Sequence, residues 1–391
     1  MDQTKYSTLM ATLQEIPDPR KARGRRYTWA FLLTLVCAGL ASGQQTAHAI
    51  AHWVTLHAQE LQACLQSESS GIPSESTLRR VLRRIDIQKL EHHLAHYADR
   101  LAAQVPATDA PDVSSDQHWQ GQAIDGKAVR GAQRHGQKLH LVSLVRHDNA
   151  MVLAQVKVDD KSNEITAVPR LLKDRDLQNV VITMDALLTQ RDLAQQIVDQ
   201  RGHYLLIVKE NQGNLYRAIA LLFDKPPWLK HERAKMYHRC QTFNKGHGRL
   251  ETRTLESSPA LSKYLDWPGV GQVLRRRCKR VNRKTGEVSI ETTYGITSLR
   301  PEQALVMQLE ALWRGHWTIE NRVHRVRDVT MGEDACQIHT TDAPQVLAAL
   351  RNAILNVLRS RGWTNIADAF RHYAASVSRA LDLIGATPAR L

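Results

Sequence analysis

The order of secondary-structure elements indicated between residues 121 and 209 constrains the fold most. GQAIDGKAVRG suggests a strand ending in a turn, and LHLVSLVRHDNAMVLAQVKV predicts two alternating strands joined at residues 147–149. A helix near 164–173, the buried strand VVITMDA, a helix near 190–200 and the strand HYLLIVK follow. Because three strands precede two helix–strand units, we expect an α/β fold in which a three-stranded meander is extended by parallel strands.

Two aspartates lie at the ends of predicted strands. Asp125 ends the first strand and precedes Gly126, which lets the backbone turn sharply, and Asp185 ends the fourth. The element order is that of a ribonuclease H-like mixed sheet, in which strands one and four are neighbours, so we expect the two carboxylates to converge. A single strand-end aspartate more often caps a helix or holds a turn. A convergent pair suits Mg²⁺ or Mn²⁺, which prefer carboxylate oxygens and water.

A third carboxylate, Glu320, lies in the segment RGHWTIENRVHRVRD. On an α-helix it shares its face with His316, His324, Arg327 and Asp328. Taken alone, the segment is more typical of a surface helix with paired charges. A zinc site made by His316, Glu320 and His324 is a weaker interpretation, because the H-E-x-x-H pattern of zinc proteases is absent.

The charge balance favours a polyanionic partner. The chain has 391 residues, enough for two or three domains, and its hydrophobic fraction of 42% is that of a globular protein. Its 53 Lys and Arg exceed its 39 Asp and Glu, which gives a net charge of +14. Nucleic acid is the commonest partner of such a chain.

Cysteine usage and hydropathy indicate a cytoplasmic protein without a membrane segment. The 5 cysteines are far apart and form no C-x-x-C pair, so neither a disulfide scaffold nor a cysteine-rich zinc site is expected. No apolar signal core is evident near residue 1. The apolar run Trp29–Ala41 is too short to span a bilayer and predicts a buried helix.

We expect four regions along the chain. Residues 1–110 form a helical DNA-binding region, and the segment SESTLRRVLRRI within it predicts either the second helix of a helix-turn-helix or a solvated arginine face. A linker rich in Pro, Asp and Ser covers 106–120. Residues 118–224 form the first part of the catalytic core, and 225–300 form a basic β-rich insertion with a hairpin near Thr285–Gly286. Residues 301–391 contain the core helix that carries the third carboxylate, followed by C-terminal helices.

Several of these strings together resemble bacterial insertion-sequence transposases. AIDGKAVRG, TMDALLTQ and HWTIENRVHRVRDVTMGED are similar to the three acidic motifs of DDE transposases. IPDPRKARGRRY, YLLIVKENQGNL and HGRLETRTL are also similar to segments of the branch that includes the H-repeat-associated proteins of Rhs elements. The resemblance covers nearly the whole chain, and its strength lies in the order and spacing of the motifs.

The resemblance implies a catalytic and metal-binding triad of Asp125, Asp185 and Glu320 in a ribonuclease H-like core. Two Mg²⁺ or Mn²⁺ ions on these carboxylates would support cleavage at the ends of the element and attack of the freed 3′-hydroxyl on target DNA. Double-stranded DNA is the implied partner, and pairing of two ends implies a homodimer. Leu188 and Arg325 depart from the branch, which usually has His and often has Trp at these positions.

Other polar residues are candidates for holding DNA. By resemblance, Arg327 corresponds to the basic position that follows the catalytic glutamate in related transposases. The other candidates lie beside the predicted site or on one face of a predicted strand. For each, a solvated basic face is the simpler interpretation. Trp317 could stack on a base, although a buried position is more common. The complete set of candidates is Lys127, Arg130, Lys209, Gln212, His247, Arg249, Arg253 and Arg327.

Two other functions remain compatible with the sequence. A nuclease of the same fold would cut without joining, and it would share the triad. An inactive or repurposed relative would bind DNA only. The intact triad favours an enzyme over the second possibility.

Overall fold

The structure is a computed structural model that describes residues 8–23, 25–66, 71–105, 119–134, 137–159, 162–224, 237–246 and 248–386. Residues 1–7, part of the predicted linker (106–118), residues 225–236 and His247 are among those outside the described ranges. Most of the linker prediction therefore falls on residues that are not described.

The N-terminal region is helical, as predicted. Its helices are α1 (Leu9–Gln14), α2 (Trp29–Ala41), α3 (Ala47–Leu56), α4 (Ala58–Leu65), α5 (Glu75–Arg84) and α6 (Ile87–Gln104). The apolar run forms α2, whose first turn is capped because the Thr28 hydroxyl accepts a hydrogen bond from the Phe31 amide at 3.2 Å. Nearly every residue of α2 is buried, so the prediction of a buried helix is confirmed.

The basic helix α5 differs from the predicted second helix of a helix-turn-helix. Its main packing partners are α3, α12 and α2 rather than α4, the helix before it. Residues 67–70 of the connection lie outside the described ranges. Only Leu78, Val81 and Leu82 of α5 are buried, so its arginines remain on the accessible side.

A nine-stranded sheet forms the centre of the molecule, in the order β3-β2-β1-β4-β5-β9-β8-β7-β6. The first five strands are β1 (Gln120–Arg134), β2 (Gln137–Arg146), β3 (Val152–Lys157), β4 (Val180–Met184) and β5 (His203–Val208). The pairs β1/β4 and β4/β5 are parallel, whereas β1/β2 and β2/β3 are antiparallel. The predicted succession of strands and helices is confirmed, and strands one and four are neighbours.

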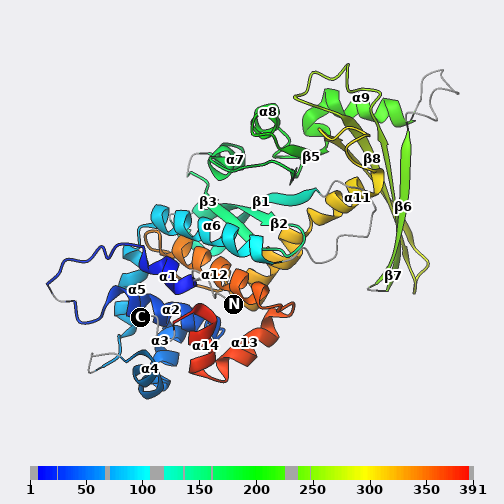
Figure 1. The fold of residues 1–391 in the computed structure, drawn as a ribbon. Helices are drawn as coiled ribbons and strands as arrows, with labels where there is room; N and C mark the ends of the chain where they lie inside the picture. Colours follow the sequence, from blue (N-terminus) through cyan, green and yellow to red (C-terminus); the bar gives the residue numbers. More distant parts are fainter. Residues whose placement is uncertain are drawn as a thin grey trace, which may run out of the picture.

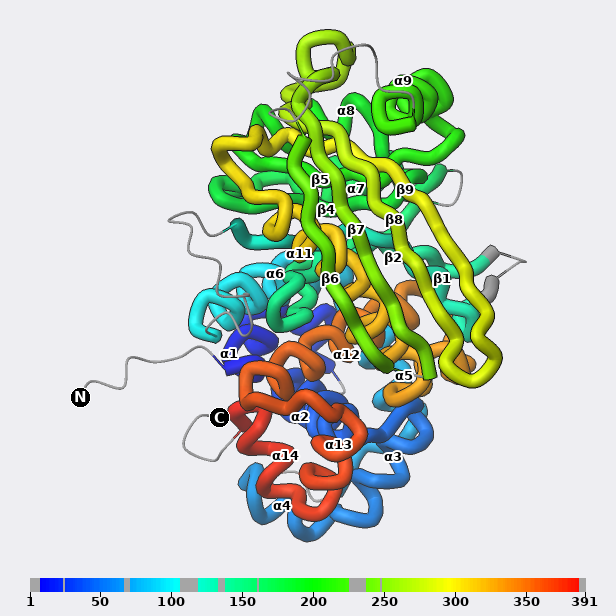
Figure 2. Tube along the Cα trace, turned by 90° about the vertical axis from the view of Figure 1, so that its right-hand side faces the viewer, coloured from blue at the N-terminus to red at the C-terminus, as the bar shows by residue number. Residues whose placement is uncertain are grey.

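The predicted insertion continues the same sheet. Its strands are β6 (His238–Gly246), β7 (Arg249–Ser258), β8 (Gln272–Asn282) and β9 (Val288–Thr297). Antiparallel pairing of β9 with β5 joins these four strands to the core, and Gly286 lies in the predicted β8–β9 turn with φ +72°. Figure 2 shows the long strands β6–β9 running side by side beyond the rest of the sheet.

Helices cover both faces of the sheet. The helices α7 (Glu164–Leu172), α8 (Arg191–Asp199) and α9 (Gly213–Asp224) pack on one face. On the other lie α6, α11 (Val306–Gly315) and α12 (Ala343–Ser360), and α13 (Ile366–Ala374) and α14 (Val377–Ile384) join the N-terminal helices below them (Figure 1). A short 3₁₀ helix, Glu210–Gln212, precedes α9.

The segment after α11 is π-helical rather than α-helical. It comprises η2 (Ile319–His324) and η3 (Val326–Thr330), and it ends before Gly332, which has φ +59°. The i→i+5 bonds of a π-helix give a wider turn than those of an α-helix. Residues seven positions apart therefore do not share one face, which changes the surroundings predicted for Glu320.

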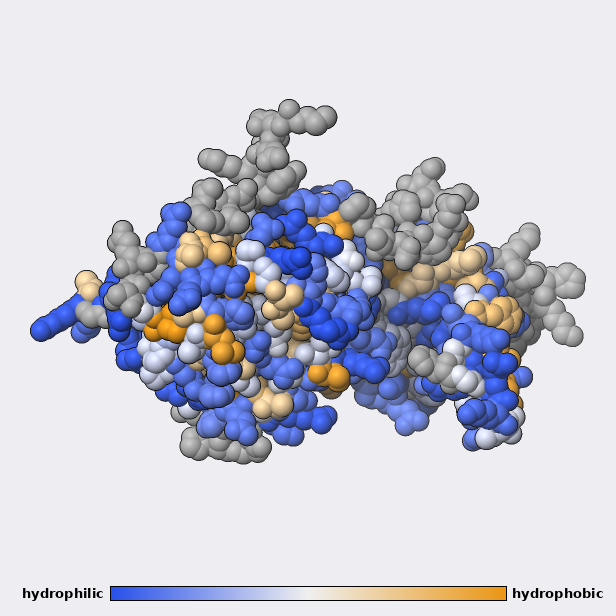
Figure 3. Space-filling model, turned by 90° about the horizontal axis from the view of Figure 1, so that it is seen from below, coloured by the Kyte–Doolittle hydropathy of each residue, from blue (hydrophilic) through white to orange (hydrophobic). Residues whose placement is uncertain are grey.

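The end of the molecule formed by the helices is largely hydrophilic at its surface. Seen from below in Figure 3, its apolar residues form small, separate patches. No helix among the described residues combines the length and apolar character needed to cross a lipid bilayer.

Candidate active site

Pairing between β1 and β4 brings Asp125 and Asp185 together. The last matched pair of these parallel strands is Ile124 with Met184, and each aspartate is the next residue. β1 does not turn at Gly126, as the sequence suggested, but continues along β2 to Arg134. Asp125 therefore lies within a long strand, at the point where β4 leaves it.

The loop after β4 holds Asp185 in place. The Leu188 amide donates a hydrogen bond to the Asp185 carboxylate at 3.0 Å, and the Leu188 side chain is buried in the core. Thr189 donates its hydroxyl to the Asp185 carbonyl at 2.9 Å. Gln212 donates its amide to the Thr189 carbonyl at 2.8 Å. Leu188 thus supports Asp185 through its backbone amide, which any residue except proline can provide.

His324 connects Glu320 to Asp125. Its Nδ1 lies 3.1 Å from Glu320 Oε2 and 3.6 Å from Asp125 Oδ2. Among the described residues, these three form a group whose ligand atoms lie within 4.8 Å of one another. His316 does not join them: its Nδ1 lies 3.0 Å from the Thr183 hydroxyl in the interior. The structure therefore contradicts the zinc set of His316, Glu320 and His324.

A fourth carboxylate, Glu164, was not predicted. It is the first residue of α7, and a Cβ added to Gly126 would collide with its carboxylate. Its Oε1 lies 2.7 Å from His140 Nε2 on β2. Glycine at 126 is explained by this close approach rather than by a turn. An acid in the first turn of a helix is ordinarily explained by the helix dipole, so no sequence pattern marks Glu164 as part of the site.

The carboxylates repel one another, and this changes their proton affinity. Burial, followed by the charge of Asp185, raises the pKa of Asp125 to about 7, with smaller contributions from Glu164 and Glu320. Burial also raises the pKa of Asp185. The hydrogen bond from His324 keeps the pKa of Glu320 below its usual range. Such crowding of like charges is costly without a cation.

Two predicted DNA contacts are buried and hold the protein together instead. Lys127 forms an ion pair with Asp328 and lies 3.7 Å from Asp334. Arg327 is 0% exposed and pairs with Glu333 at 2.8 Å. The π-helical turn places Arg327 away from the face of Glu320, so in this structure it offers no surface to DNA. These two predictions are corrected accordingly.

The triad faces a cleft of about 920 Å³ whose opposite wall is rich in arginine. Asp125, Asp185 and Glu320 lie on one side, together with Lys209 and Trp317. The other side consists of side chains from β7, β8, β9 and the end of α11, and it includes two acids, Glu251 and Glu291. Figure 2 shows these strands side by side. The arginines of this wall are Arg249, Arg253, Arg276, Arg280 and Arg314.

The remaining candidates have varied positions. Lys209, Arg249 and Arg253 line the cleft, whereas the Gln212 amide is used by the Asp185 loop. Arg130 is exposed, and its backbone amide donates to Asp334 at 3.1 Å. Trp317 is 53% exposed, so the expectation of a buried tryptophan is wrong. His247 lies outside the described residues.

Comparison with known proteins defines the class. The profile described as Transposase DDE domain matches residues 103–357, and one described as DDE_Tnp_1-associated matches residues 10–98. The chain belongs to the DDE transposase family.

Similar proteins place the chain in the branch that the sequence predicted, which includes the H-repeat-associated transposases. The chain is 30% identical over 369 residues to "Putative transposase YncI" of Escherichia coli O157:H7, covering 90% of this chain and 87% of that protein. It is 28% identical over 361 residues to "H repeat-associated putative transposase YhhI" of Escherichia coli K12, covering 90% of each. A solved piggyBac transposase synaptic complex with hairpin DNA aligns at a TM-score of 0.44 and 10% identity, over 98% of this chain and 79% of that one. That last similarity is too distant to support an inference.

Proposed function

We propose that this transposase cleaves the ends of its element with a divalent metal and joins the freed 3′-hydroxyl to target DNA. We further propose that β1–β5 with α7 and α8 form a ribonuclease H-like core. The support is the strand order, in which a three-stranded antiparallel meander is followed by two parallel strands.

One observation carries the proposal: carboxylates and arginines face each other across one cleft. Asp125, Asp185 and Glu320 form an acidic wall, while β7 and β8 supply a basic one. The arginines can bind the phosphate backbone, and the acidic wall can hold the cations needed for phosphoryl transfer. Metal binding alone would not account for the arginines, and phosphate binding alone would not account for the carboxylates.

The residues present fit a hard divalent cation. Asp125 and Asp185 provide carboxylate oxygens whose proton affinity is raised by burial, with a further contribution from Asp185 at Asp125 and from Glu164 at Asp185. A cation bound between them would relieve that repulsion. We propose Asp125, Asp185 and Glu320 as ligands for Mg²⁺ or Mn²⁺, with two ions in the active complex. When bound, the metal would activate the attacking oxygen and stabilise the leaving one.

The protein's own groups orient this site. His324 contacts both Asp125 and Glu320 and so fixes the spacing between β1 and the π-helical segment. The Leu188 amide orients Asp185. We propose Glu164 as a positioning residue that His140 directs toward the two aspartates. No side chain is needed as a nucleophile, because phosphoryl transfer depends on positioning and charge stabilisation.

DNA would lie along the basic wall. Lys209, Arg249 and Arg253 are the proposed contacts retained from the sequence, joined by Arg280 and Arg314. Arg276 is instead held by the buried Glu310. Exposed Trp317, on the acidic side, could stack on a base. We propose that two copies act together, because each of two paired element ends needs its own site.

A cleavage and joining assay tests this function. The substrate is a duplex carrying the termini of the encoding element with flanking DNA, incubated with Mg²⁺ or with EDTA. We expect metal-dependent cuts at the termini, joined products from pre-cut ends, and loss of both with Asp185→Asn. Cleavage without joining would indicate a nuclease instead. End binding without any cleavage would indicate a DNA-binding relative.

A further inference from the structure

A second basic hollow lies in the N-terminal helical region. It is formed by α5 and by the basic loop, which we define as residues 19–23 and 25–27, and its volume is about 630 Å³. The loop projects at the left of Figure 1, beside α5, whereas β6–β9 lie at the opposite side. The described residues that line the hollow include no acid, but they do include Lys21, Arg23, Arg25, Arg26, Arg80 and Arg84.

The basic loop is held in shape by its own side chains. Arg20 bridges the base of the loop, because its guanidinium donates to Asp18 at 2.9 Å and to the Tyr27 carbonyl at 2.9 Å. Arg25 donates its Nε to the Lys21 carbonyl at 3.1 Å. In Figure 3 the loop extends from the left end of the molecule as a hydrophilic arm. The cations of the loop are therefore displayed on a structured backbone.

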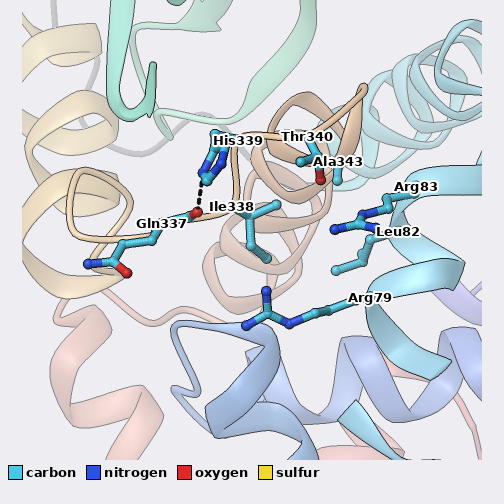
Figure 4. A pocket seen from close by; sticks show the side chains of 8 residues that line it. All are labelled: Arg79, Leu82, Arg83, Gln337, Ile338, His339, Thr340 and Ala343. Atoms are coloured by element: carbon cyan, nitrogen blue, oxygen red, sulfur yellow. Dashed lines mark hydrogen bonds between the residues drawn. The ribbon is translucent and has the colours of Figure 1, made fainter. Parts of the chain in front are cut away.

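Helix α5 divides its four arginines between two sides. Arg80 and Arg84, one turn apart, line the hollow beside the basic loop. Arg79 and Arg83, also one turn apart, point toward Ile338 and line a separate pocket of about 130 Å³ (Figure 4). Arg79 is further paired with Glu75 at 2.6 Å. One helix thus presents two arginine pairs in different surroundings.

Four of the cations that line the hollow have no carboxylate partner among the described residues. Asp18 pairs with Arg20 and approaches Arg25 at 3.4 Å. Within the described part of the chain, no carboxylate forms an ion pair with Lys21, Arg23, Arg80 or Arg84. The cleft arginines differ, because Arg276 pairs with Glu310 at 3.0 Å and Arg280 pairs with Glu291 at 2.8 Å. Uncompensated like charges held close together favour binding of a polyanion.

We infer that this hollow, the N-terminal basic groove, binds the phosphate backbone of duplex DNA at a position separate from the catalytic cleft. The inference rests on the proposed function in one respect, that the substrate is DNA. Arginine suits this partner because its guanidinium can donate two parallel hydrogen bonds to a phosphate. Contacts of this kind hold the duplex and set its register without reading its sequence.

The arginine pairs of α5 provide a matched test. We would compare Arg80→Gln/Arg84→Gln with Arg79→Gln/Arg83→Gln, which remove the same charge from the same helix. Binding of a fluorescein-labelled duplex of mixed sequence is measured by anisotropy over a series of salt concentrations. Each lost phosphate contact lowers the slope of log affinity against log salt by about 0.9. We expect the first variant to bind roughly 10-fold more weakly at moderate salt, with a slope reduced by about two, and the second to change by less than about 2-fold.

Equal effects of the two pairs, or an unchanged slope in Arg80→Gln/Arg84→Gln, would overturn the inference. Stronger displacement of the wild-type protein by single-stranded RNA than by unlabelled duplex would also overturn it. Thermal unfolding of both variants checks that α5 remains folded. Asp185→Asn separates this inference from the proposed function: it should bind the duplex normally but not cleave element ends. If wild type never cleaves while Arg80→Gln/Arg84→Gln still weakens binding, the groove stands and the catalytic proposal fails.

Discussion

The two halves of the nine-stranded sheet are built for different tasks. Strands β1–β5 lie between helices, and every residue of β4 is buried. Strands β6–β9 extend past the helices, and most of β6 is exposed. The buried half can fix carboxylates closely together, because β1 and β4, which lead to Asp125 and Asp185, are paired on both sides and covered by helices. The exposed half can offer arginines over a long surface. Continuous pairing through β5 and β9 keeps the two surfaces facing each other.

The largest effect should follow from removing a carboxylate of the buried half. In Asp185→Asn, the geometry of the loop is retained but a proposed metal ligand is lost. We expect the cleavage rate at saturating DNA to fall on the order of 10³-fold or more, as for other members of a concerted catalytic set. Single-turnover kinetics measure this, and the affinity for DNA should be unchanged. A cleavage rate within about 10-fold of the wild-type rate would exclude Asp185 from the chemistry.

Burial of Asp125, together with the charge of Asp185 beside it, should make metal-free stability depend on pH. The pKa of Asp125 is about 7 in the folded chain, compared with 3.8 for a free side chain. The folded state therefore holds a proton that the unfolded state releases, and stability is lost as pH rises from about 4 to about 7. In EDTA, Asp125→Asn should be more stable than wild type at pH 8 by roughly 2–4 kcal/mol. Near pH 4 the two should unfold alike, and urea titrations at both pH values measure the difference. A pH-independent difference would contradict the raised pKa of Asp125.

A smaller loss is expected from Glu164→Gln. Groups that orient metal ligands typically contribute about 10- to 100-fold to activity or metal affinity. We expect a decrease of that size in cleavage rate, together with a higher Mg²⁺ concentration for half-maximal activity. Gly126→Ala, which displaces Glu164 without removing its charge, should act in the same direction. A purely structural role would instead lower thermal stability and leave the Mg²⁺ dependence unchanged.

The exposed half should affect binding rather than chemistry. Arg249→Gln/Arg253→Gln should weaken DNA binding by about 10-fold and reduce the salt slope, with cleavage recovering at high DNA concentration. Strand alternation provides the control, because Arg277 and Lys279 point away from the cleft on β8. Arg277→Gln/Lys279→Gln removes the same charge and should change affinity by less than about 2-fold. Equal losses would show that total charge, not the cleft wall, determines affinity.

Much of the buried half could be predicted from the sequence, because it depends on local periodicity. The strands ending at Asp125 and Asp185, the buried helix α2 and the β8–β9 turn all follow from apolar spacing and turn residues. What could not be predicted depends on contacts between distant segments. Glu164 and Gly126 come close together from two distant elements. In the sequence each residue has a local explanation, the helix dipole for Glu164 and a turn for Gly126.

The surroundings of Glu320 show a second limit of sequence reasoning. The sequence predicts an α-helix there, with Arg327 on the same face as Glu320. The chain is instead π-helical, and Arg327 pairs with Glu333, whose second partner, Arg351, lies 3.4 Å away on α12. The choice between these helices is made by tertiary packing and buried ion pairs, which local propensity does not report.

Metal binding in solution tests most directly whether the acidic wall forms one site. Mn²⁺ titration followed by electron paramagnetic resonance would compare wild type with Asp125→Asn, Asp185→Asn and Glu320→Gln. Glu291→Gln removes a carboxylate from the opposite wall of the same cleft and is the matched control. We predict that each triad variant weakens Mn²⁺ binding by at least about 10-fold and that Glu291→Gln does not. Wild-type affinity in all three triad variants, or an equal loss in Glu291→Gln, would contradict the account.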